Sequence, residues 1–250
     1  MRILLSNDDG IEAQGIEALV QALGKQHELV VAAPMYQQSG MAHALTVGTP
    51  MEVKHNKRLE DKYGITAIAV DGTPTDCVKL YLEAMAGEVQ PELVVSGINH
   101  GANLATDVLY SGTVGAAMEG YLHDISSVAL SLEVSSSLSY REAAEIFAAD
   151  LKKLMPGHEK PFFYNINFPK RLKDNRPQYV FGRQGKRDYV NAFQREEKAG
   201  HVFYTMAGEV YDSDKGKATD IFAIESGYIS ITPLITDITD YVELDARLEK

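Results

Sequence analysis

Short apolar runs alternate with amphipathic segments over the first two-thirds of the chain. The apolar runs are rich in β-branched residues and predict buried strands at residues 2–6, 28–33, 65–70, 92–96 and 127–132. Their nearly continuous apolar character is typical of strands covered on both faces. Helical spacing of apolar residues predicts helices at residues 14–25, 74–86, 113–123 and 140–154. This alternation predicts a mostly parallel, doubly wound α/β sheet.

The C-terminal third has a different pattern. Between about residue 170 and residue 230, short aromatic and β-branched runs alternate with Gly, Asp and Lys. This composition predicts hairpins in an extension that packs on the main body or on a partner subunit. We interpret the chain as one domain, residues 1–250, with an α/β core over 1–168, a β-rich extension and oligomerisation segment over 169–235, and a C-terminal helix over 236–250.

The balance of charge narrows the classes of partner. The 250 residues include 35 acidic and 24 basic side chains, for a net charge of −11. Such a chain is not expected to bind nucleic acid polymers or anionic membranes through non-specific charge. The single cysteine, Cys77, cannot form an internal disulfide, which fits a reducing compartment. Because the chain has no apolar run of about 18 residues and no signal-peptide pattern, we expect a cytoplasmic protein that does not span a membrane.

Two adjacent acids follow the first predicted strand in the segment SNDDG, residues 6–10. Asp8 and Asp9 repel each other, and each resists desolvation. An Asp-Gly turn with one acid capping the next helix is a sufficient structural interpretation. The alternative is a carboxylate pair that holds a hard cation through oxygen. The segment by itself leaves both interpretations open.

A second polar loop, APMYQQSGMAHALT at residues 33–46, follows the second predicted strand. The Ser39 hydroxyl can bind a metal or donate to a phosphate oxygen, although a loop serine without a role is the commoner case. His43 is a candidate acid or base, but a lone loop histidine more often has a structural role. The segment DGTPTD at residues 71–76 is explained fully by a turn and a helix cap at Thr73.

The segment VVSGINHGANLATDVLYSGTVGAAMEG, residues 94–120, is the most informative. A strand opens into a Gly/Asn loop that contains Asn99 and Asn103, and long ordered loops are commonly functional. The next helix begins at SGT, so its first N–H groups and the hydroxyls of Ser111 and Thr113 can face an anion. Ordinary N-capping by either hydroxyl is the structural alternative. The segment is not a P-loop, because no GK[ST] sequence follows.

These clusters belong together because ligands collect at the carboxyl ends of parallel strands. Two carboxylates, a hydroxyl and an amide oxygen form an all-oxygen set that suits Mg²⁺ or Mn²⁺. A phosphate held between such a cation and the helix start is ready for in-line attack by water. Either Asp9 or water activated by the cation starts that attack, and the sequence does not choose between them. Without the cation, the carboxylates would repel the phosphate.

Four blocks of the sequence resemble the SurE family of metal-dependent survival-protein phosphatases, namely ILLSNDDGIEAQGI, DGTPTDCVKL, SGINHGANLATDVLYSGTVGAAMEG and GYISITPL. The similarity runs from residue 1 to about residue 234. It implies a Rossmann-like core, a protruding β-hairpin, and homodimers or homotetramers that exchange C-terminal segments. It also implies a 5′-nucleotidase that acts on nucleoside 5′-monophosphates, with broader activity that includes 3′-nucleotides and short polyphosphate.

The resemblance also implies roles for individual residues. It implies one divalent cation per subunit, Mg²⁺ or Mn²⁺, held by Asp8, Asp9, Ser39 and Asn99, with Asp8 and Asp9 as the catalytic pair. It implies phosphate contacts from Asn103, Ser111, Gly112 and Thr113, so that Thr113→Ala should weaken phosphate binding more than metal binding. Gln38 stands where the family usually carries a basic residue, and Ala105 stands where a glycine is usual. Neither departure removes an implied ligand.

Three other classes of protein fit the sequence less well. A haloacid dehalogenase-type phosphatase needs a second Asp two positions after the first, where this chain has Gly10 and Ile11. A receiver-type signalling module that binds Mg²⁺ could use Asp71, but no lysine directly follows the last predicted core strand. A dinucleotide-binding oxidoreductase needs a GxGxxG sequence after the first strand, which is absent. A trapped aspartyl-phosphate would favour the first of these alternatives.

Overall fold

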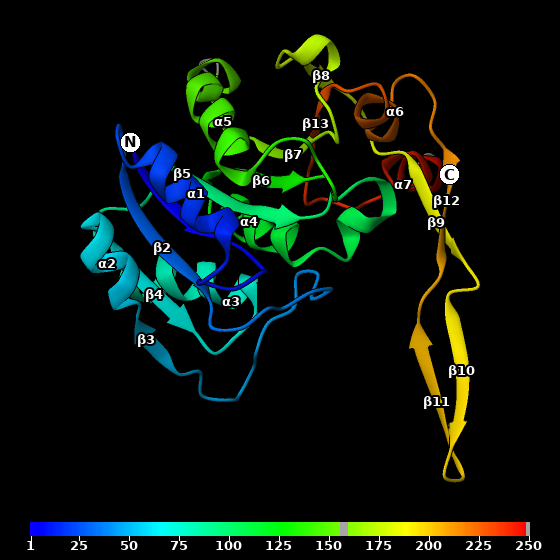
Figure 1. Ribbon diagram of the computed structural model, residues 1–250, viewed down its shortest axis with the longest axis horizontal. Coiled ribbons are helices and arrows are strands. Elements are labelled where there is room, and N and C mark those ends of the chain that lie inside the picture. Colours follow the sequence, from blue (N-terminus) through cyan, green and yellow to red (C-terminus); the bar gives the residue numbers. More distant parts are fainter. Residues whose placement is uncertain (156–159, 249–250) are drawn as a thin grey trace.

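A nine-stranded sheet forms the centre of the protein (Figure 1). The computed structural model describes residues 1–155 and 160–248. The sheet order is β3-β4-β2-β1-β5-β6-β7-β13-β8. These strands are β1 (Arg2–Ser6), β2 (Glu28–Pro34), β3 (Val53–His55), β4 (Thr66–Val70), β5 (Leu93–His100), β6 (Ser126–Leu132), β7 (Phe163–Phe168), β8 (Tyr179–Phe181) and β13 (Ile229–Pro233).

The six neighbouring strands from β4 to β7 in that order run parallel to one another. From β1 the chain proceeds to β2 and β4 on one side and then to β5 on the other side of β1. This reversal creates a topological switch point, where a crevice opens at the carboxyl ends of β1 and β5. The expected doubly wound α/β fold is therefore confirmed.

Helices cover both faces of the sheet (Figure 1). One face carries α1 (Gln14–Leu23) and α5 (Tyr140–Leu154), and the other carries α3 (Pro74–Leu80) and α4 (Gly112–Leu122). In β1, Ile3 and Leu5 join the first core while Leu4 joins the second. All three are fully buried, because successive side chains of a strand point to opposite faces. Because both faces of the sheet are covered, β1 needs apolar residues at successive positions, and this is the continuous apolar run that predicted the strand.

Strand β5 is longer than the predicted strand at residues 92–96. It continues to His100 through a register shift between Ser96 and Asn99. Gly97 has a φ of 144°, and a Cβ there would lie 2.3 Å from the Leu130 carbonyl oxygen. The Gly/Asn composition that predicted a loop therefore belongs in part to an irregular end of β5. Glycine is required at residue 97 because β6 approaches it closely.

The segment expected to be one helix at residues 74–86 has two parts. Helix α3 ends at Leu80 and continues as a π-helical turn over Tyr81–Met85. The expected cap at Thr73 is confirmed, because its hydroxyl accepts the N–H of Asp76 while Asp76 accepts the N–H of Thr73. The remaining helices are α2 (Lys57–Tyr63), α6 (Asp220–Glu225), α7 (Tyr241–Leu248), η2 (Ala105–Leu109) and η3 (Lys173–Asn175).

A long antiparallel arm projects from the body (Figure 1). Its root pairs β9 (Lys186–Val190) with β12 (Glu209–Asp214), and its tip pairs β10 (Phe193–Lys198) with β11 (His201–Met206). These strands fit the expected hairpins of residues 169–235.

Not all of the expected extension at residues 169–235 leaves the body. Strands β8 and β13 lie in the main sheet, where β13 pairs antiparallel with β7. GYISITPL, at the end of this segment, is a buried strand of the main sheet, with Ile229 and Ile231 in the core. Strand β7 was not predicted, since its buried Asn165 and Asn167 interrupt the apolar pattern.

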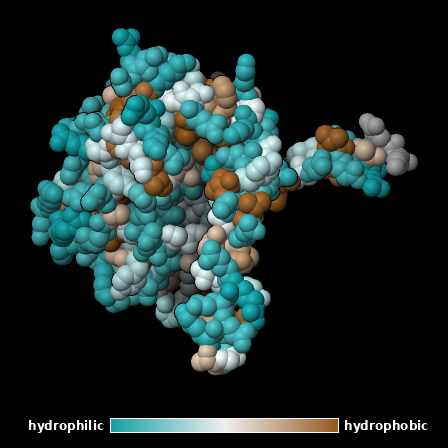
Figure 2. Space-filling model, turned by 45° about the vertical axis from the view of Figure 1, so that its right-hand side comes forward, coloured by the Kyte–Doolittle hydropathy of each residue, from teal (hydrophilic) through white to brown (hydrophobic). Residues whose placement is uncertain are grey.

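The helix expected over residues 236–250 is shorter. Helix α7 begins at Tyr241, and residues 249 and 250 lie outside the described residues. It has no buried residue and stands off the body in Figure 2. Within residues 1–155 and 160–248, no helix has the length and apolar character needed to cross a bilayer.

Candidate metal and phosphate site

A cavity of about 590 Å³ lies at the carboxyl ends of β1 and β5. One part is polar, lined by Asp8, Asp9, Ser39, Asn99, Asn103 and Ser111. The lining also includes Tyr110, Tyr189, Ala192 and Met206. Residues predicted from three separate segments of the chain, at 6–10, 33–46 and 94–120, thus meet at the switch point.

Asp8 is the buried member of the acid pair, with 6% of its surface exposed. Its carboxylate accepts a hydrogen bond from the hydroxyl of Thr113. Burial raises its pKa to about 6; the negative charge of Asp9 adds to this rise, and the bond from Thr113 opposes it. The site therefore disfavours the negative form of Asp8 until a positive charge compensates it.

Asp9 is half-buried and is held by two donors. Its Oδ2 accepts the backbone N–H of His100 at 3.1 Å, and its Oδ1 accepts from the side chain of Gln37 at 3.3 Å. The end of β5 and the loop after β2 therefore orient this carboxylate. A divalent cation can still reach it, because Asp9 lines the cavity.

Asn99 and Ser39 complete an oxygen donor set. The amide nitrogen of Asn99 donates to the Gly101 carbonyl at 2.7 Å, which leaves the amide oxygen for a cation. Ser39 is exposed on its loop, and that loop is attached to the acid pair by the bond from the Gln38 N–H to the Asp8 carbonyl at 2.7 Å. Carboxylate, hydroxyl and amide oxygens fit Mg²⁺ or Mn²⁺ better than a soft metal.

The start of α4 meets the acid pair. Ser111 caps the helix by accepting the N–H of Val114 at 3.2 Å, and its hydroxyl hydrogen stays available to an anion. A Cβ at Gly112 would lie 3.0 Å from the Cβ of Asp8, so only glycine lets the helix approach so closely. The first N–H groups of a helix have no partner within it, and they form a natural anion site.

Thr113 differs from expectation. Its side chain is fully buried, it does not line the cavity, and its hydroxyl is committed to Asp8. The residue can therefore reach a phosphate only through its backbone N–H. We now expect loss of this hydroxyl to weaken metal binding first, because it orients a carboxylate of the pair.

The charged residues that the structure describes around the cavity are mainly acidic. Among the described residues that line it, the charged ones are Asp8, Asp9 and Asp107, and none is Lys or Arg. Asp107 is neutralised from outside by Arg187, at 2.9 Å. An anion could enter beside the acid pair only with a cation, since like charges repel strongly at short range.

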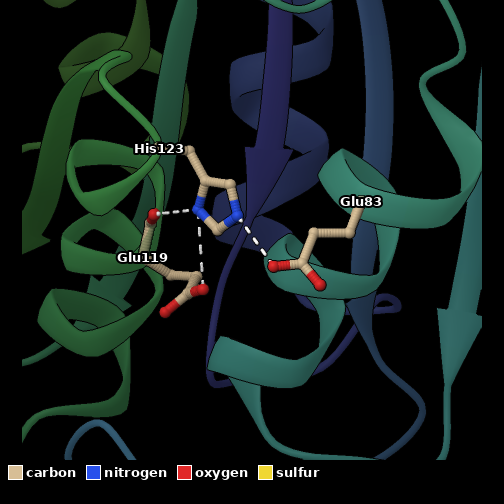
Figure 3. A group of neighbouring side chains, drawn as sticks. All are labelled: Glu83, Glu119 and His123. Carbon is tan, nitrogen blue, oxygen red and sulfur yellow. Dashed lines mark hydrogen bonds and ion pairs between the residues drawn. The ribbon is translucent and has the colours of Figure 1, made fainter.

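A second acidic group lies between the π-helical turn Tyr81–Met85 and the C-terminal end of α4 (Figure 3). Glu83, Glu119 and His123 bring ligand atoms within 4.8 Å of one another, a spacing that could hold a metal ion. However, the Lys79 ammonium already lies 2.6 Å from Glu83 and 3.1 Å from Glu119. Glu119 also binds His43 at 2.8 Å. We interpret this group as an internal ion network, in which His43 has the structural role considered for it.

The sequence did not indicate the residues that hold η2 beside the cavity. Tyr189 donates to Asp107 at 2.8 Å, and Arg187 bridges Asp107 and Asp212. Fully buried Asp220 accepts the backbone N–H of Ala105 at 2.7 Å. These contacts join residues far apart in the chain, so the only available signal was the occurrence of charged and polar residues in an otherwise β-rich segment.

Fold and site together define an α/β protein whose switch-point cavity combines paired carboxylates with a helix N-terminus. Residues 3–191 match the family described as Survival protein SurE. The chain therefore belongs to the SurE family, as the sequence blocks had indicated.

Similar proteins extend the match over the full chain. A 5′-nucleotidase SurE of Pelotomaculum thermopropionicum is 45% identical, over 100% of this chain and 95% of that protein. A 5′-nucleotidase SurE of Natranaerobius thermophilus is 40% identical, over 96% of this chain and 95% of its own length. The crystal structure of the SurE protein from Aquifex aeolicus matches with a TM-score of 0.83 at 35% identity and covers 100% of both chains. The expected fold class is thus confirmed by a solved relative.

Proposed function

We propose that this chain is a metal-dependent 5′-nucleotidase, a phosphoric monoester hydrolase that acts on nucleoside 5′-monophosphates. The observation that carries the proposal is the position of Asp8 and Asp9 against the start of α4, in a cavity whose described lining residues include no Lys or Arg. Such a cavity needs a cation to accept a phosphate. Similar proteins from two bacteria carry the name 5′-nucleotidase, which supports the same reaction.

Asp8, Asp9, Ser39 and Asn99 are the proposed ligands of one divalent ion per subunit, Mg²⁺ or Mn²⁺. When bound, the ion supplies the positive charge that admits the phosphate and makes water a stronger acid. The raised pKa of Asp8, about 6, supports this assignment, because a buried carboxylate next to a second acid needs a counter-charge to remain ionised.

The remaining roles belong to Asn103 and Ser111, which line the cavity, and to the backbone at the start of α4 next to them. The N–H groups of Gly112 and Thr113, the hydroxyl of Ser111 and the amide of Asn103 would donate to phosphate oxygens and offset the charge that builds there. Asp9 is the candidate general base because it is half-buried and lines the cavity. Asp8 is more deeply buried and is better suited to holding the ion.

The aromatic and apolar residues that line the cavity suit a nucleoside. Tyr110, Tyr189 and Met206 offer flat or adaptable apolar surfaces on which a base can rest. Tyr189 is 46% exposed and Met206 is 74% exposed, so the base is only loosely enclosed. We therefore include 3′-nucleotides and short polyphosphate among the substrates of this site.

The test is a metal titration of the full chain after EDTA treatment, with Mn²⁺ or Mg²⁺ added back and with AMP, 3′-AMP and tripolyphosphate as substrates. We expect hydrolysis to vanish with EDTA and to return with either ion. Asp8→Asn and Asp9→Asn should each lower kcat/KM by at least about a hundredfold, whereas Glu83→Gln, in the second acidic group, should not. Undiminished activity in EDTA, or in either Asp variant, would overturn the proposal.

We also propose that the protein assembles as a homodimer or homotetramer through its projecting parts. Apolar side chains are exposed along the arm, at Phe193, Val202, Phe203, Tyr204 and Met206, and α7 contributes further exposed ones at Tyr241, Val242 and Leu248. Exposed strand edges and apolar patches favour association. Light scattering should give a mass of two or four chains, and a variant with residues 193–206 replaced by a short turn should have a lower mass.

A cytoplasmic location completes the proposal. The single cysteine is free and buried, and burial raises the pKa of its thiol, so it is poorly suited to disulfide chemistry. Fractionation of cells that express the full chain should recover it with cytoplasmic marker proteins.

A further inference from the structure

Two buried asparagines of β7 hold the backbone of Asn103. The N–H of Asn103 donates to Oδ1 of Asn167 at 2.8 Å. The carbonyl of Asn103 accepts from Nδ2 of Asn165 at 2.8 Å and from Nδ2 of Asn167 at 3.1 Å. Both peptide groups that flank this residue are therefore fixed by side chains from a distant strand.

The side chain of Asn103 is fixed by a third buried group. Its Nδ2 donates to the hydroxyl of Ser131 at 2.9 Å, and Ser131 lies beside Asn167 in the β6–β7 register. An amide nitrogen has two hydrogens, so one remains after this bond. Asn103 lines the cavity, and the remaining N–H is the group that can donate to an anion there.

The burial of these amides demands an explanation. Asn165, Asn167 and Ser131 are each 0% exposed, and an amide without partners would cost several kcal/mol to bury. The opposite face of β7 carries Tyr164 and Ile166, which join the apolar core. Apolar side chains would pack equally well on the face of β7 that is turned toward α4. The amides of Asn165 and Asn167 are therefore explained by their hydrogen bonds to the loop that contains Asn103.

We propose that Asn167 and Asn165, with Ser131, are positioning residues that aim the Asn103 amide at the substrate phosphate. This inference rests on the proposed phosphatase function. Asn167 has the central place, because it holds both the N–H and the carbonyl of Asn103. A shift of about 1 Å in a substrate-binding group can lower activity by roughly a hundredfold. A small displacement of the Asn103 amide should therefore be measurable as weaker binding of phosphate.

The decisive experiment is a double-mutant cycle in the metal-loaded full chain. Asn167→Ala, Asn103→Ala and the double variant are compared by the KM for AMP and by the inhibition constant of inorganic phosphate. Asn167→Ala should raise both values roughly tenfold or more, while Mn²⁺ affinity, measured by calorimetry, stays within twofold of wild type. In the Asn103→Ala background, Asn167→Ala should add little, because both changes remove the same contact.

Ser230→Ala is the matched control. Ser230 is fully buried, lies opposite Asn167 in the next strand, and has an unpartnered hydroxyl. It should leave both constants unchanged. If Asn167→Ala fails to fold, the same cycle is run with Ser131→Ala, which removes only the side-chain contact.

The outcomes separate two failures. Additive effects of the Asn103 and Asn167 changes, or an Asn167→Ala variant no different from Ser230→Ala, would overturn the positioning role. A wild-type protein that binds no inorganic phosphate and hydrolyses no AMP with Mn²⁺ or Mg²⁺ present would instead overturn the proposed function itself.

Discussion

Single residues at the site have sharply different surroundings. Asp8 is buried and bonded to Thr113, whereas its neighbour Asp9 is half-buried and bonded to the backbone of His100. The two acids therefore differ in their need for a counter-charge, although they are identical in chemistry. This difference gives a prediction that does not require a substrate.

The metal-free protein should become more stable through Asp8 as the pH falls. Because burial raises its pKa from 3.8 to about 6, the folded state binds a proton more tightly than the unfolded state. The contribution should grow from pH 7 toward pH 4 and reach about 3 kcal/mol. Urea unfolding in EDTA, compared between wild type and Asp8→Asn, should show this pH-dependent difference.

Other carboxylates change the total, so only the difference between the two proteins is informative. Asp61→Asn, at an exposed position of α2, serves as control and should track wild type at every pH. Parallel stability curves for wild type and Asp8→Asn would show that Asp8 is not in the buried environment described above.

Ala105 offers a second test at this scale. Its φ is 52°, a left-handed conformation that is unfavourable for residues with a Cβ and free for glycine. Ala105→Gly should therefore stabilise the protein by about 0.5–1 kcal/mol, measured as a rise in the midpoint of urea unfolding. The Ala105 N–H donates to Asp220, and the Ala105 carbonyl accepts from the side chain of Gln184. A lowered midpoint would mean that these two hydrogen bonds do not hold residue 105 at a positive φ.

At the scale of elements, the site depends on how closely helices approach strand ends. A Cβ at Gly15 would lie 2.1 Å from the Ile98 carbonyl oxygen, so α1 lies directly on the irregular end of β5. A Cβ at Gly112 would meet both Asp8 and Pro74, at 3.0 and 3.1 Å. Close packing of this kind tolerates little added volume.

Gly112→Ala should therefore displace Asp8. We expect it to destabilise the protein by about 1–3 kcal/mol and to weaken Mn²⁺ binding at least tenfold, as measured by calorimetry. Gly216→Ala is the control, because a Cβ there would have only an ordinary contact of 3.5 Å with Asp214. Wild-type Mn²⁺ affinity in Gly112→Ala would contradict the packing of α4 against the acid pair.

At the scale of the whole molecule, the arm is connected to the site. Residues of its root and tip, Tyr189, Ala192 and Met206, line the cavity. Arg187 joins the root to Asp107 of η2 and to Asp212 of β12, with only 14% of its side chain exposed. The position of the arm and the shape of the cavity beside Tyr189 and Met206 should therefore change together.

Arg187→Met should raise the KM for AMP by roughly tenfold, because it leaves the carboxylates of Asp107 and Asp212 without their cationic partner near the proposed base-binding residues. The inhibition constant of inorganic phosphate should change far less, since the Asn103 and α4 contacts do not involve the arm. Arg195→Met, at an exposed pair on the arm tip, is the control. Equal effects of Arg187→Met on both constants would argue against separate contacts to the nucleoside.

Much of the site was predictable because its residues follow strands that the apolar pattern located well. Asp8 and Asp9 follow β1, Ser39 follows β2 and Asn99 lies near the end of β5, and a parallel sheet brings such ends to one edge. The family assignment is confirmed by the match over residues 3–191. The ligand and phosphate roles stay predictions, to be tested by the variants described above.

The sequence by itself determined the strand-helix alternation, the family and the segments that meet at the switch point, because each depends on local apolar periodicity or on contiguous motifs. Only the tertiary structure decided that Thr113 binds Asp8, that β13 joins the main sheet and that Asn165 and Asn167 hold Asn103. These are contacts between residues far apart in the chain. No local pattern encodes them, since burial and hydrogen-bond partners are set by which elements the whole fold brings together.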